Sequence, residues 1–452
     1  MNCDNYLVKC PTVIQKDRPV CVEVPGSKSI TNRALLLAAM AEGKSVLRGC
    51  LTSEDARHFL ECLKTLGFAV TETPSGSLNV DVEITGCGGS IPEKEAEIYV
   101  GSAGTAARFL VAMLAFSDGR YVVNSSEQMK KRPMMPLISS LREAGVEVEC
   151  LEEEGHFPLR ITGVRRQREG KEAYLPQRFY VNIDKSSQFL SALLIAAATL
   201  PGETAVLVSG SHGLSYVDLT VEMMKDFGAF VEKCTVDSES AQLCYRVSGG
   251  KLCALDYAVE PDMSAAAYFY ALAAVLGVGI SVSGIKKNML QGDVAFLDVL
   301  EKMGCSLQET EKKDVEVWGG KAALKGGMTV DMSAFSDQAL TLAAIAPFAD
   351  GPVTITGIGH IRLQECDRIR AIAENLTALG IRVEEGQDWV KIYPGTPTGC
   401  EIETFEDHRV AMSFALTGLR TPGVIIRNPG CCKKTFAEYF QVLEKTVETL
   451  GA

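Results

Sequence analysis

Apolar and polar residues follow one another along the chain in a repeated order of elements. A short apolar strand is followed by a loop, a helix, a Leu-Gly or similar turn, and a second strand. This unit recurs at residues 45–70, 121–149, 205–232, 280–308, 353–385 and 423–451. The units start about 70–85 residues apart, and self-similarity at a fixed period indicates a repeat architecture.

A second helix with a polar start and an Ala/Leu-rich body precedes each unit. These helices begin with "SKSITNRALLLAAM", "GSAGTAARFLVAML", "KSSQFLSALLIAAA", "DMSAAAYFYALAAV", "SDQALTLAAIAP" and "EDHRVAMSFALTGL". Because the bodies are apolar nearly all round, the pattern predicts that these helices are buried. The polar residues at their starts then need a polar environment, and we expect the helix N-termini to converge on one cleft.

Six units in 452 residues predict two α/β domains of three units each, because one core rarely grows to that size. The junction is expected near "LDYAVEPDM" (255–263). The strand-like segment 1–24 precedes the first unit and could pair with the second domain. We therefore predict an N-terminal domain of residues 25–258, and a C-terminal domain of 1–24 plus 259–452. A ligand cleft between the domains is the default expectation.

Composition and charge narrow the class of protein. With 46% hydrophobic and 23% charged residues the chain is typical of a globular protein, and no apolar run reaches spanning length. The formal charge of −12 argues against nucleic acid as a partner. Fifteen cysteines without a CxxC pair, and five histidines without zinc-ligand spacing, indicate reduced thiols, a cytoplasmic location and no structural metal.

The start of the first buried helix carries the clearest candidate chemistry. Ser27, Lys28, Ser29, Asn32 and Arg33 occupy its first turns. A helix N-terminus favours anions, since its free N–H groups and its dipole point outward. A capped helix with a solvated basic end explains this stretch alone about equally well. The other polar starts are also individually weak, and their recurrence at one place in the repeat makes a shared anion site the better interpretation.

Six of these stretches also resemble a known family. "PGSKSITNRALLLAA", "GSAGTAAR", "SSQFLSALL", "ECDR", "DHRVAM" and "KKTFAEYF" occur in the order found in the 5-enolpyruvylshikimate-3-phosphate (EPSP) synthases, enolpyruvyl transferases also described as 3-phosphoshikimate 1-carboxyvinyltransferases. The resemblance covers the chain from end to end. It implies a two-domain inside-out α/β barrel, with three βαβαββ repeats and buried helices in each domain.

The resemblance also implies an activity. The enolpyruvyl group of phosphoenolpyruvate would be transferred to the 5-hydroxyl of shikimate 3-phosphate by addition and elimination, with release of phosphate. This reaction belongs to the shikimate pathway, which leads to chorismate and the aromatic amino acids. No metal or other cofactor is implied, and neither nucleic acid nor a membrane is expected as a partner. We expect a monomer.

Site residues are carried over from the family position by position. For shikimate 3-phosphate the resemblance implies Lys28, Ser29, Arg33, Ser186, Ser187, Gln188, Tyr216 and Asp337. For phosphoenolpyruvate it implies Lys28, Gly104, Arg132, Gln188, Arg368, Arg409 and Lys434. The implied catalytic residues are Asp337, which holds the reacting hydroxyl, Glu365, which handles the methylene proton, and Lys28.

The sequence departs from the family pattern at several positions, including Ser102 and Phe109, and two departures bear most on the site. Gln364 stands where a lysine is usual, so another basic residue or an altered specificity must be considered. The segment "HGLSYVDLT" is two residues short, and either Ser211 or Ser215 would supply its hydroxyl.

Two alternatives remain open at this point. A catalytically decayed phospho-ligand-binding relative is supported only by Gln364. A UDP-N-acetylglucosamine enolpyruvyl transferase is disfavoured, because "SSEQMKKRPMMP" lacks the cysteine that the loop carries in that family.

Overall fold

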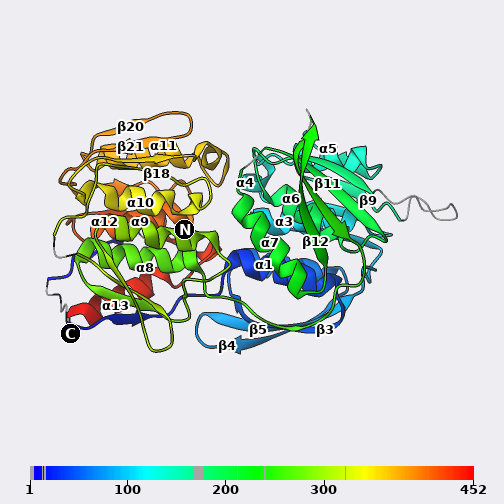
Figure 1. The fold of residues 1–452 in the computed structure, drawn as a ribbon, viewed down its shortest axis with the longest axis horizontal. Coiled ribbons are helices and arrows are strands. Elements are labelled where there is room, and N and C mark those ends of the chain that lie inside the picture. Colours follow the sequence, from blue (N-terminus) through cyan, green and yellow to red (C-terminus); the bar gives the residue numbers. More distant parts are fainter. Residues whose placement is uncertain are drawn as a thin grey trace. The chain divides into compact units, whose positions relative to one another are not determined.

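The protein is described by a computed structural model that covers residues 5–12, 14, 17–165, 177–210, 212–238, 241–320 and 322–451. The chain divides into two compact units (Figure 1). The N-terminal unit is Lys28–Val259, and the C-terminal unit combines Met1–Ser27 with Glu260–Ala452.

Three four-stranded sheets with a common strand order make up the described part of the N-terminal unit. The first contains β14 (Asp256–Ala258), β3 (Glu42–Leu51), β5 (Asn79–Cys87) and β4 (Ala69–Ser75), in that order. The second contains β6 (Glu95–Tyr99), β7 (Arg120–Asn124), β9 (Leu159–Thr162) and β8 (Glu147–Cys150). The third contains β10 (Arg178–Asn182), β11 (Glu203–Ser209), β13 (Ala241–Ser248) and β12 (Phe230–Ser238). In each sheet the first two strands pair in parallel and the others antiparallel.

The helices of this unit are α1 (Lys28–Met40), α2 (Glu54–Thr65), α3 (Gly104–Ala115), α4 (Glu127–Lys130), α5 (Met135–Glu143), α6 (Gln188–Ala197) and α7 (Leu214–Asp226). Helix α3 joins the parallel strands β6 and β7, and α6 joins β10 and β11. Parallel strands need such a crossover, so the second and third repeats are βαβ units, each followed by a further helix and a pair of antiparallel strands.

The described part of the C-terminal unit repeats this order three times, with the last sheet shortened to three strands. Its first sheet contains β2 (Val20–Val22), β15 (Gly279–Val282), β17 (Val315–Trp318) and β16 (Ser306–Glu309). The second contains β18 (Met328–Asp331), β19 (Val353–Thr356), β21 (Val390–Ile392) and β20 (Val383–Glu385). The third contains β22 (Glu401–Ile402), β23 (Ile425–Ile426) and β1 (Tyr6–Leu7).

The α-helices of the C-terminal unit are α8 (Met263–Leu276), α9 (Phe296–Lys302), α10 (Ala339–Ile345), α11 (Arg368–Ala378), α12 (His408–Gly418) and α13 (Tyr439–Gly451). Short 3₁₀ segments precede or follow them: η2 (Gly292–Ala295), η3 (Ser336–Gln338), η4 (Ala346–Phe348), η5 (Gly359–Leu363) and η6 (Pro429–Lys434). Helix α10 joins β18 to β19, and α12 joins β22 to β23.

The leading strands of the first and fourth repeats are exchanged between the units. Strand β2 directly precedes α1 in the sequence, yet it pairs in parallel with β15, with Val20 opposite Ile280. Strand β14 directly precedes α8, yet it pairs in parallel with β3, with Asp256 opposite Val46. The N-terminal stretch, dark blue in Figure 1, therefore belongs to the C-terminal unit, where β1 also pairs with β23.

The prediction that the Ala/Leu-rich helices are buried is confirmed. Every residue of α8 and α10 is buried, and so is all of α12. In the N-terminal unit α1, α3 and α6 are buried except at their first residues, and α3 packs against both α1 and α6. Strands such as β10 and β11 alternate buried and exposed positions, which is the pattern of a sheet with one face on the core. Closure of the sheets into a barrel stays a prediction.

The described chain gives no support for a membrane span or a disulfide. None of its helices is both long and apolar enough to cross a bilayer. The fourteen cysteines that the structure describes are free thiols.

Candidate active site

The start of α1 places a lysine beside a carboxylate of the next helix. Nζ of Lys28 lies 3.9 Å from Oδ2 of Asp55, in the first turn of α2, and the Lys28 side chain is 19% exposed. This is a loose ion pair by distance. The ammonium group of Lys28 therefore keeps access to solvent at the start of a helix that has no acidic residue in its first turn.

Arg33 is one helical turn further along α1 and is buried against α7. Its Nε donates to Oγ1 of Thr220 at 2.7 Å, and its two terminal nitrogens donate to the carbonyls of Ser29 and Tyr216 at 2.9 and 3.0 Å. Its guanidinium carbon is 5.5 Å from the ring centre of Phe109. All these partners are neutral, and burial lowers the pKa of Arg33 to about 10.

A second cationic group surrounds the start of α3. A side chain on Gly104 would place its Cβ 2.4 Å from Nη1 of Arg132, so only glycine lets this guanidinium lie against the helix start. Arg108, which is 2% exposed, donates to Oε1 of Gln188 at 2.5 Å. Burial, together with the charge of Arg132, holds the pKa of Arg108 well below its usual range. These contacts bring two arginines and a glycine to one helix N-terminus.

Gln188, the first residue of α6, has both ends of its amide fixed. Oε1 accepts from Arg108, while Nε2 donates to Oγ1 of Thr105 at 3.0 Å. The amide of the backbone at Gln188 also donates to Oγ of Ser186 at 3.3 Å. The structure thus links the starts of α3 and α6 through one side chain.

The two serines before α6 lie beside the start of α7. Gly213 has φ +63°, and a Cβ there would come within 2.7 Å of Oγ of Ser187. This left-handed, side-chain-free residue lets the loop approach Ser187 and turn into α7, which carries Tyr216. Ser215 is also on α7, while Ser211 lies outside the described residues.

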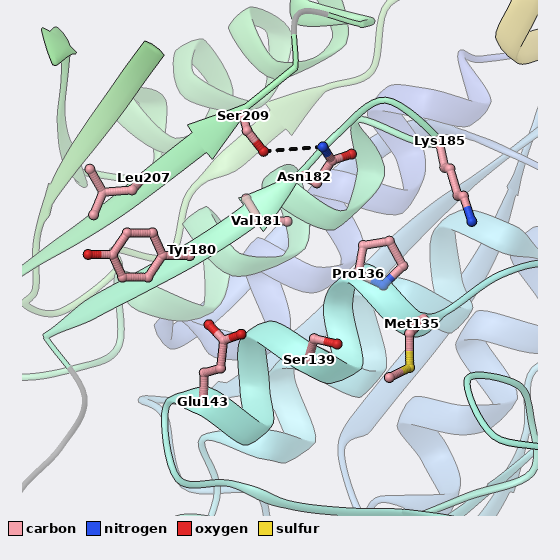
Figure 2. Close-up of a pocket in the computed structure, with 10 residues that line it drawn as sticks. All are labelled: Met135, Pro136, Ser139, Glu143, Tyr180, Val181, Asn182, Lys185, Leu207 and Ser209. Carbon is pink, nitrogen blue, oxygen red and sulfur yellow. Dashed lines mark hydrogen bonds between the residues drawn. The ribbon is translucent and has the colours of Figure 1, made fainter. Parts of the chain in front are cut away.

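A pocket of about 470 Å³ in the same unit is separate from these groups. Figure 2 shows it where α5 faces β10 and β11, with the Asn182 amide donating to Ser209 across the strands at 3.2 Å. Its charged lining residues are Lys185 and Glu143. Of the described residues that line it, none is a predicted site residue, so the pocket has no part in the proposed chemistry.

In the C-terminal unit Asp337 lies between two buried arginines. Its Oδ2 accepts from Nη2 of Arg409 at 2.7 Å, and its Oδ1 accepts from Nη1 of Arg368 at 3.2 Å. The Asp337 side chain is 21% exposed, whereas those of Arg368 and Arg409 are 3% and 9% exposed. The two arginines therefore fix the position of the Asp337 carboxylate, and part of the Asp337 side chain remains exposed.

Arg368 also anchors a fully buried carboxylate. Its Nε donates to Oδ2 of Asp407 at 2.7 Å and its Nη2 to Oδ1 at 3.2 Å, and Asp407 also caps the start of α12. Burial alone would lower the pKa of Arg368, and the charges of Asp407 and Asp337 outweigh it and raise that pKa. Nη1 of Arg368 also donates to the amide oxygen of Gln364. Gln364, the residue that departs from the family pattern, is thus a hydrogen-bond acceptor for the guanidinium group of Arg368.

Glu365 makes its contacts with two cationic or protonatable side chains. Oε2 lies 2.8 Å from Nδ1 of His408, and Oε1 lies 3.2 Å from Nζ of Lys434. All three side chains are at most 9% exposed. The two carboxylate oxygens of Glu365 are therefore each in contact with a different side chain.

Glu365, Asp407 and His408 also lie close enough together to be considered as metal ligands. Lys434 contacts Glu365, however, and Arg368 makes two bonds with Asp407. Two cations at these oxygens would repel a metal ion. The donor set fits an ion-pair network better than a metal centre.

The structure brings the predicted site residues together within each unit. The basic, hydroxyl and amide residues gather at the starts of α1, α3, α6 and α7, while Asp337, Glu365, Arg368, Arg409 and Lys434 gather at the starts of α10, α11 and α12 and in η6. Sequence reasoning missed Asp407 and Asp293 as members of the second group. Asp407 directly precedes α12, and Asp293 lies in η2 just before α9, so their positions near helix starts were an available signal.

Comparison with known proteins agrees with the sequence resemblance. The family described as EPSP synthase (3-phosphoshikimate 1-carboxyvinyltransferase) matches residues 16–443. The 3-phosphoshikimate 1-carboxyvinyltransferase of Nostoc punctiforme is 41% identical over 436 residues, which is 95% of this chain and 98% of the relative. The enzyme numbered 2 of the same name from Halalkalibacterium halodurans is 42% identical over 94% of this chain and 91% of its own.

A solved structure of EPSP synthase from Acinetobacter baumannii matches the fold with a TM-score of 0.77 at 27% identity, over 98% of this chain and 97% of that one. The two-domain α/β fold, the six repeated sheets of the described residues and the sequence match all lead to one assignment. The chain belongs to the EPSP synthase (3-phosphoshikimate 1-carboxyvinyltransferase) family.

Proposed function

We propose that the residues described above carry out the enolpyruvyl transfer of this family. The reaction moves the enolpyruvyl group of phosphoenolpyruvate to the 5-hydroxyl of shikimate 3-phosphate and releases phosphate, in the pathway to chorismate and the aromatic amino acids. Family membership over nearly the whole chain supports the activity. The roles of individual residues rest on their positions and contacts in each unit.

We assign the shikimate 3-phosphate side mainly to the N-terminal unit. Its residues are Lys28, Ser29, Arg33, Ser186, Ser187, Gln188 and Tyr216. The substrate carries a carboxylate and a phosphate, and helix starts with cations and hydroxyls suit both groups. Because Arg33 is 2% exposed and makes three bonds with the protein, it contributes through its charge and by holding α7 beside α1.

For phosphoenolpyruvate we propose the residues that the family resemblance implies. Gly104, Arg132 and Gln188 come from the N-terminal unit, with Lys28 serving both substrates. Arg368, Arg409 and Lys434 come from the C-terminal unit. The planar guanidinium groups fit a carboxylate, and an ammonium group suits the less directional charge of a phosphate.

The two carboxylates then have separate tasks. Glu365 delivers a proton to the methylene carbon of phosphoenolpyruvate, which leaves a cationic centre at the neighbouring carbon. Asp337 accepts the proton of the 5-hydroxyl as its oxygen attacks that centre and forms a tetrahedral intermediate. Removal of a methyl proton, by Glu365 in turn, then rebuilds the double bond as phosphate leaves.

Gln364 does not supply the cation that the family pattern places there. Its amide oxygen accepts a hydrogen bond from Arg368 instead, while Nζ of Lys434, in η6, lies 3.2 Å from Oε1 of Glu365. We propose that Lys434 neutralises the leaving phosphate in this chain.

The observation that carries this proposal is the pair of held carboxylates, Asp337 between two arginines and Glu365 between His408 and Lys434. The test is steady-state phosphate release from phosphoenolpyruvate by the purified chain. Release that requires shikimate 3-phosphate supports the proposal. Release that requires UDP-N-acetylglucosamine instead, or no release with either acceptor, overturns it.

A further inference from the structure

A buried carboxylate that the assignments above do not use lies next to Asp337. Asp293, in η2, is 3% exposed. Its Oδ1 accepts from Nε2 of Gln338 at 2.8 Å and from Oγ of Ser264 at 3.2 Å. Both donors are neutral, and no described residue forms a salt bridge with Asp293 in the structure.

Each of these two donors is either adjacent in sequence or hydrogen-bonded to a residue of the proposed site. Gln338 follows Asp337 in η3 and is fully buried, and its Oε1 accepts from Oγ1 of Thr341 at 3.1 Å. With both ends of its amide bonded, Gln338 fixes the short turn that presents Asp337. Asp293 supplies one of those two bonds.

The second route runs through the Ser264 hydroxyl. Because its proton is directed to Asp293, its lone pairs are left to accept from Nη2 of Arg409 at 3.4 Å. The same Nη2 donates to Oδ2 of Asp337 at 2.7 Å. Asp293, Ser264, Arg409 and Asp337 thus form one continuous chain of hydrogen bonds.

The ionised form of the Asp293 carboxylate is electrostatically unfavourable in this environment. Burial, followed by the charges of Asp337 and Asp262, raises the pKa of Asp293 to about 6, against the opposing effect of Arg409 and of the Gln338 hydrogen bond. An asparagine could accept the same two bonds without a buried charge. Stability therefore does not account for a carboxylate here.

We infer that Asp293 is a positioning residue for the transfer reaction: its ionised carboxylate, through Gln338 and Ser264, fixes Asp337 and Arg409 in the arrangement that accepts the hydroxyl proton. The inference rests on the proposed function, which gives Asp337 and Arg409 their roles. Asp293 itself touches neither substrate. Because hydrogen bonds to an ionised acceptor are stronger than those to a neutral one, it holds the Ser264 proton and the Gln338 amide toward itself more firmly than an asparagine would.

The test compares Asp293→Asn with wild type over pH 5 to 8, with both substrates saturating and phosphate release as the readout. We expect the variant to turn over roughly tenfold more slowly at pH 8. The ratio of the two rates should approach one as the pH falls through about 6, because wild-type Asp293 is then neutral as well. Titrating groups that do not interact with Asp293 act on both proteins and cancel in the ratio, whereas Asp337 and Asp262 interact with Asp293, so the change in the ratio reports the titration of this group of carboxylates together.

The melting temperature gives a second readout, and we expect Asp293→Asn to raise it although the substitution lowers turnover. The pKa of Asp293 is higher in the folded state than in the unfolded state. Protonated Asp293 therefore contributes to stability at pH values below its unfolded-state pKa, and this contribution to stability is lost as the pH rises through about 6. Asp293→Asn should therefore gain in melting temperature relative to wild type between pH 5 and 8 while it loses turnover. A residue with only a structural role would lose both together.

Two further variants complete the design. Ser264→Ala should lower turnover, and the double variant with Asp293→Asn should be less impaired than the product of the single losses, because both act through one route. Thr417→Val is the matched control, since it removes a buried hydrogen bond from α12 to the carbonyl of Ala344 but leaves the Asp293 chain intact. It should lower the melting temperature with turnover unchanged.

The outcomes separate this inference from the proposed function. If wild type shows no shikimate 3-phosphate-dependent release, the proposed function fails. If wild type is active and Asp293→Asn matches it at every pH, or is slower by the same factor from pH 5 to 8, the role of the ionised Asp293 is refuted while the proposed function stands.

Discussion

Each unit buries two arginines near the starts of its inner helices, and the two pairs have different partners. Arg33 and Arg108 of the N-terminal unit donate to hydroxyl, carbonyl and amide oxygens, and burial lowers the pKa of both. Arg368 and Arg409 of the C-terminal unit both donate to Asp337. The carboxylates around Arg368 raise its pKa in spite of burial.

The difference separates binding from proton handling. A buried cation with only neutral partners keeps a positive potential, which an anionic ligand can use. A cation neutralised by carboxylates keeps little of that potential, but it holds the carboxylates in fixed positions. The N-terminal arginines are therefore suited mainly to attracting anions, whereas the C-terminal arginines hold Asp337 in place in addition to the phosphoenolpyruvate contacts proposed for them.

The largest effect is expected from the two carboxylates of the C-terminal unit. Asp337→Asn and Glu365→Gln should each lower turnover by roughly 10²–10⁴-fold with little change in substrate binding, because the loss of a general acid or base acts on the chemical step. The variants should differ in the exchange of solvent deuterium into the methylene group of phosphoenolpyruvate, followed by NMR. Only Glu365→Gln should slow it. Wild-type exchange in Glu365→Gln, with turnover lost, would remove the role given to Glu365.

Stability should respond most strongly at Arg368. Arg368→Met leaves Asp407, which is fully buried, without its two guanidinium bonds, and breaking a buried pair in this way typically costs about 3–5 kcal/mol. The melting temperature measured by calorimetry should fall accordingly. The double variant Arg368→Met/Asp407→Asn removes the orphaned charge and should recover most of the loss. A single variant that melts like wild type would show that the pair does not stabilise the unit.

Arg409→Lys tests the binding role of the same group of charges. Lysine keeps the charge but not the planar pair of donors, so the KM for phosphoenolpyruvate should rise roughly 10–100-fold. The KM for shikimate 3-phosphate should change far less. Steady-state kinetics with each substrate varied in turn measures both. An equal rise in the two constants would mean that Arg409 acts on the fold of the unit rather than on one substrate.

The smallest effect on stability is expected at Arg108. Arg108→Met removes a buried charge that forms no salt bridge with any described residue, at the expense of its hydrogen bonds to Gln188 and to the carbonyl of Gly104, and the net change in the free energy of unfolding should stay within about 1 kcal/mol. Substrate affinity should fall nevertheless, because Gln188 loses its fixed orientation and the site loses potential. If Arg108→Met unfolds as readily as Arg368→Met, the contrast between the units is wrong.

Much of the architecture was predictable because it depends on local patterns. The helices beginning at Lys28 and Met263 are apolar on every side, and such helices have no stable place except a core. Asp337 and Glu365 could be assigned because short motifs around them match the family. Gln364 was recognised as a departure, but its bond to Arg368 depends on how η5 meets α11 and could not be foreseen.

The sequence by itself determined the six repeats, the buried helices with polar starts, the family and the identity of the candidate site residues, because each of these is written in periodicity or in a contiguous motif. Only the tertiary structure decided which strands exchange, with β2 on β15 and β14 on β3, since strand pairing joins segments more than two hundred residues apart. It also decided which carboxylate each arginine meets. Asp407 and Asp293 gained their importance in this way, because the charge of a buried group is governed by neighbours that packing brings from other repeats.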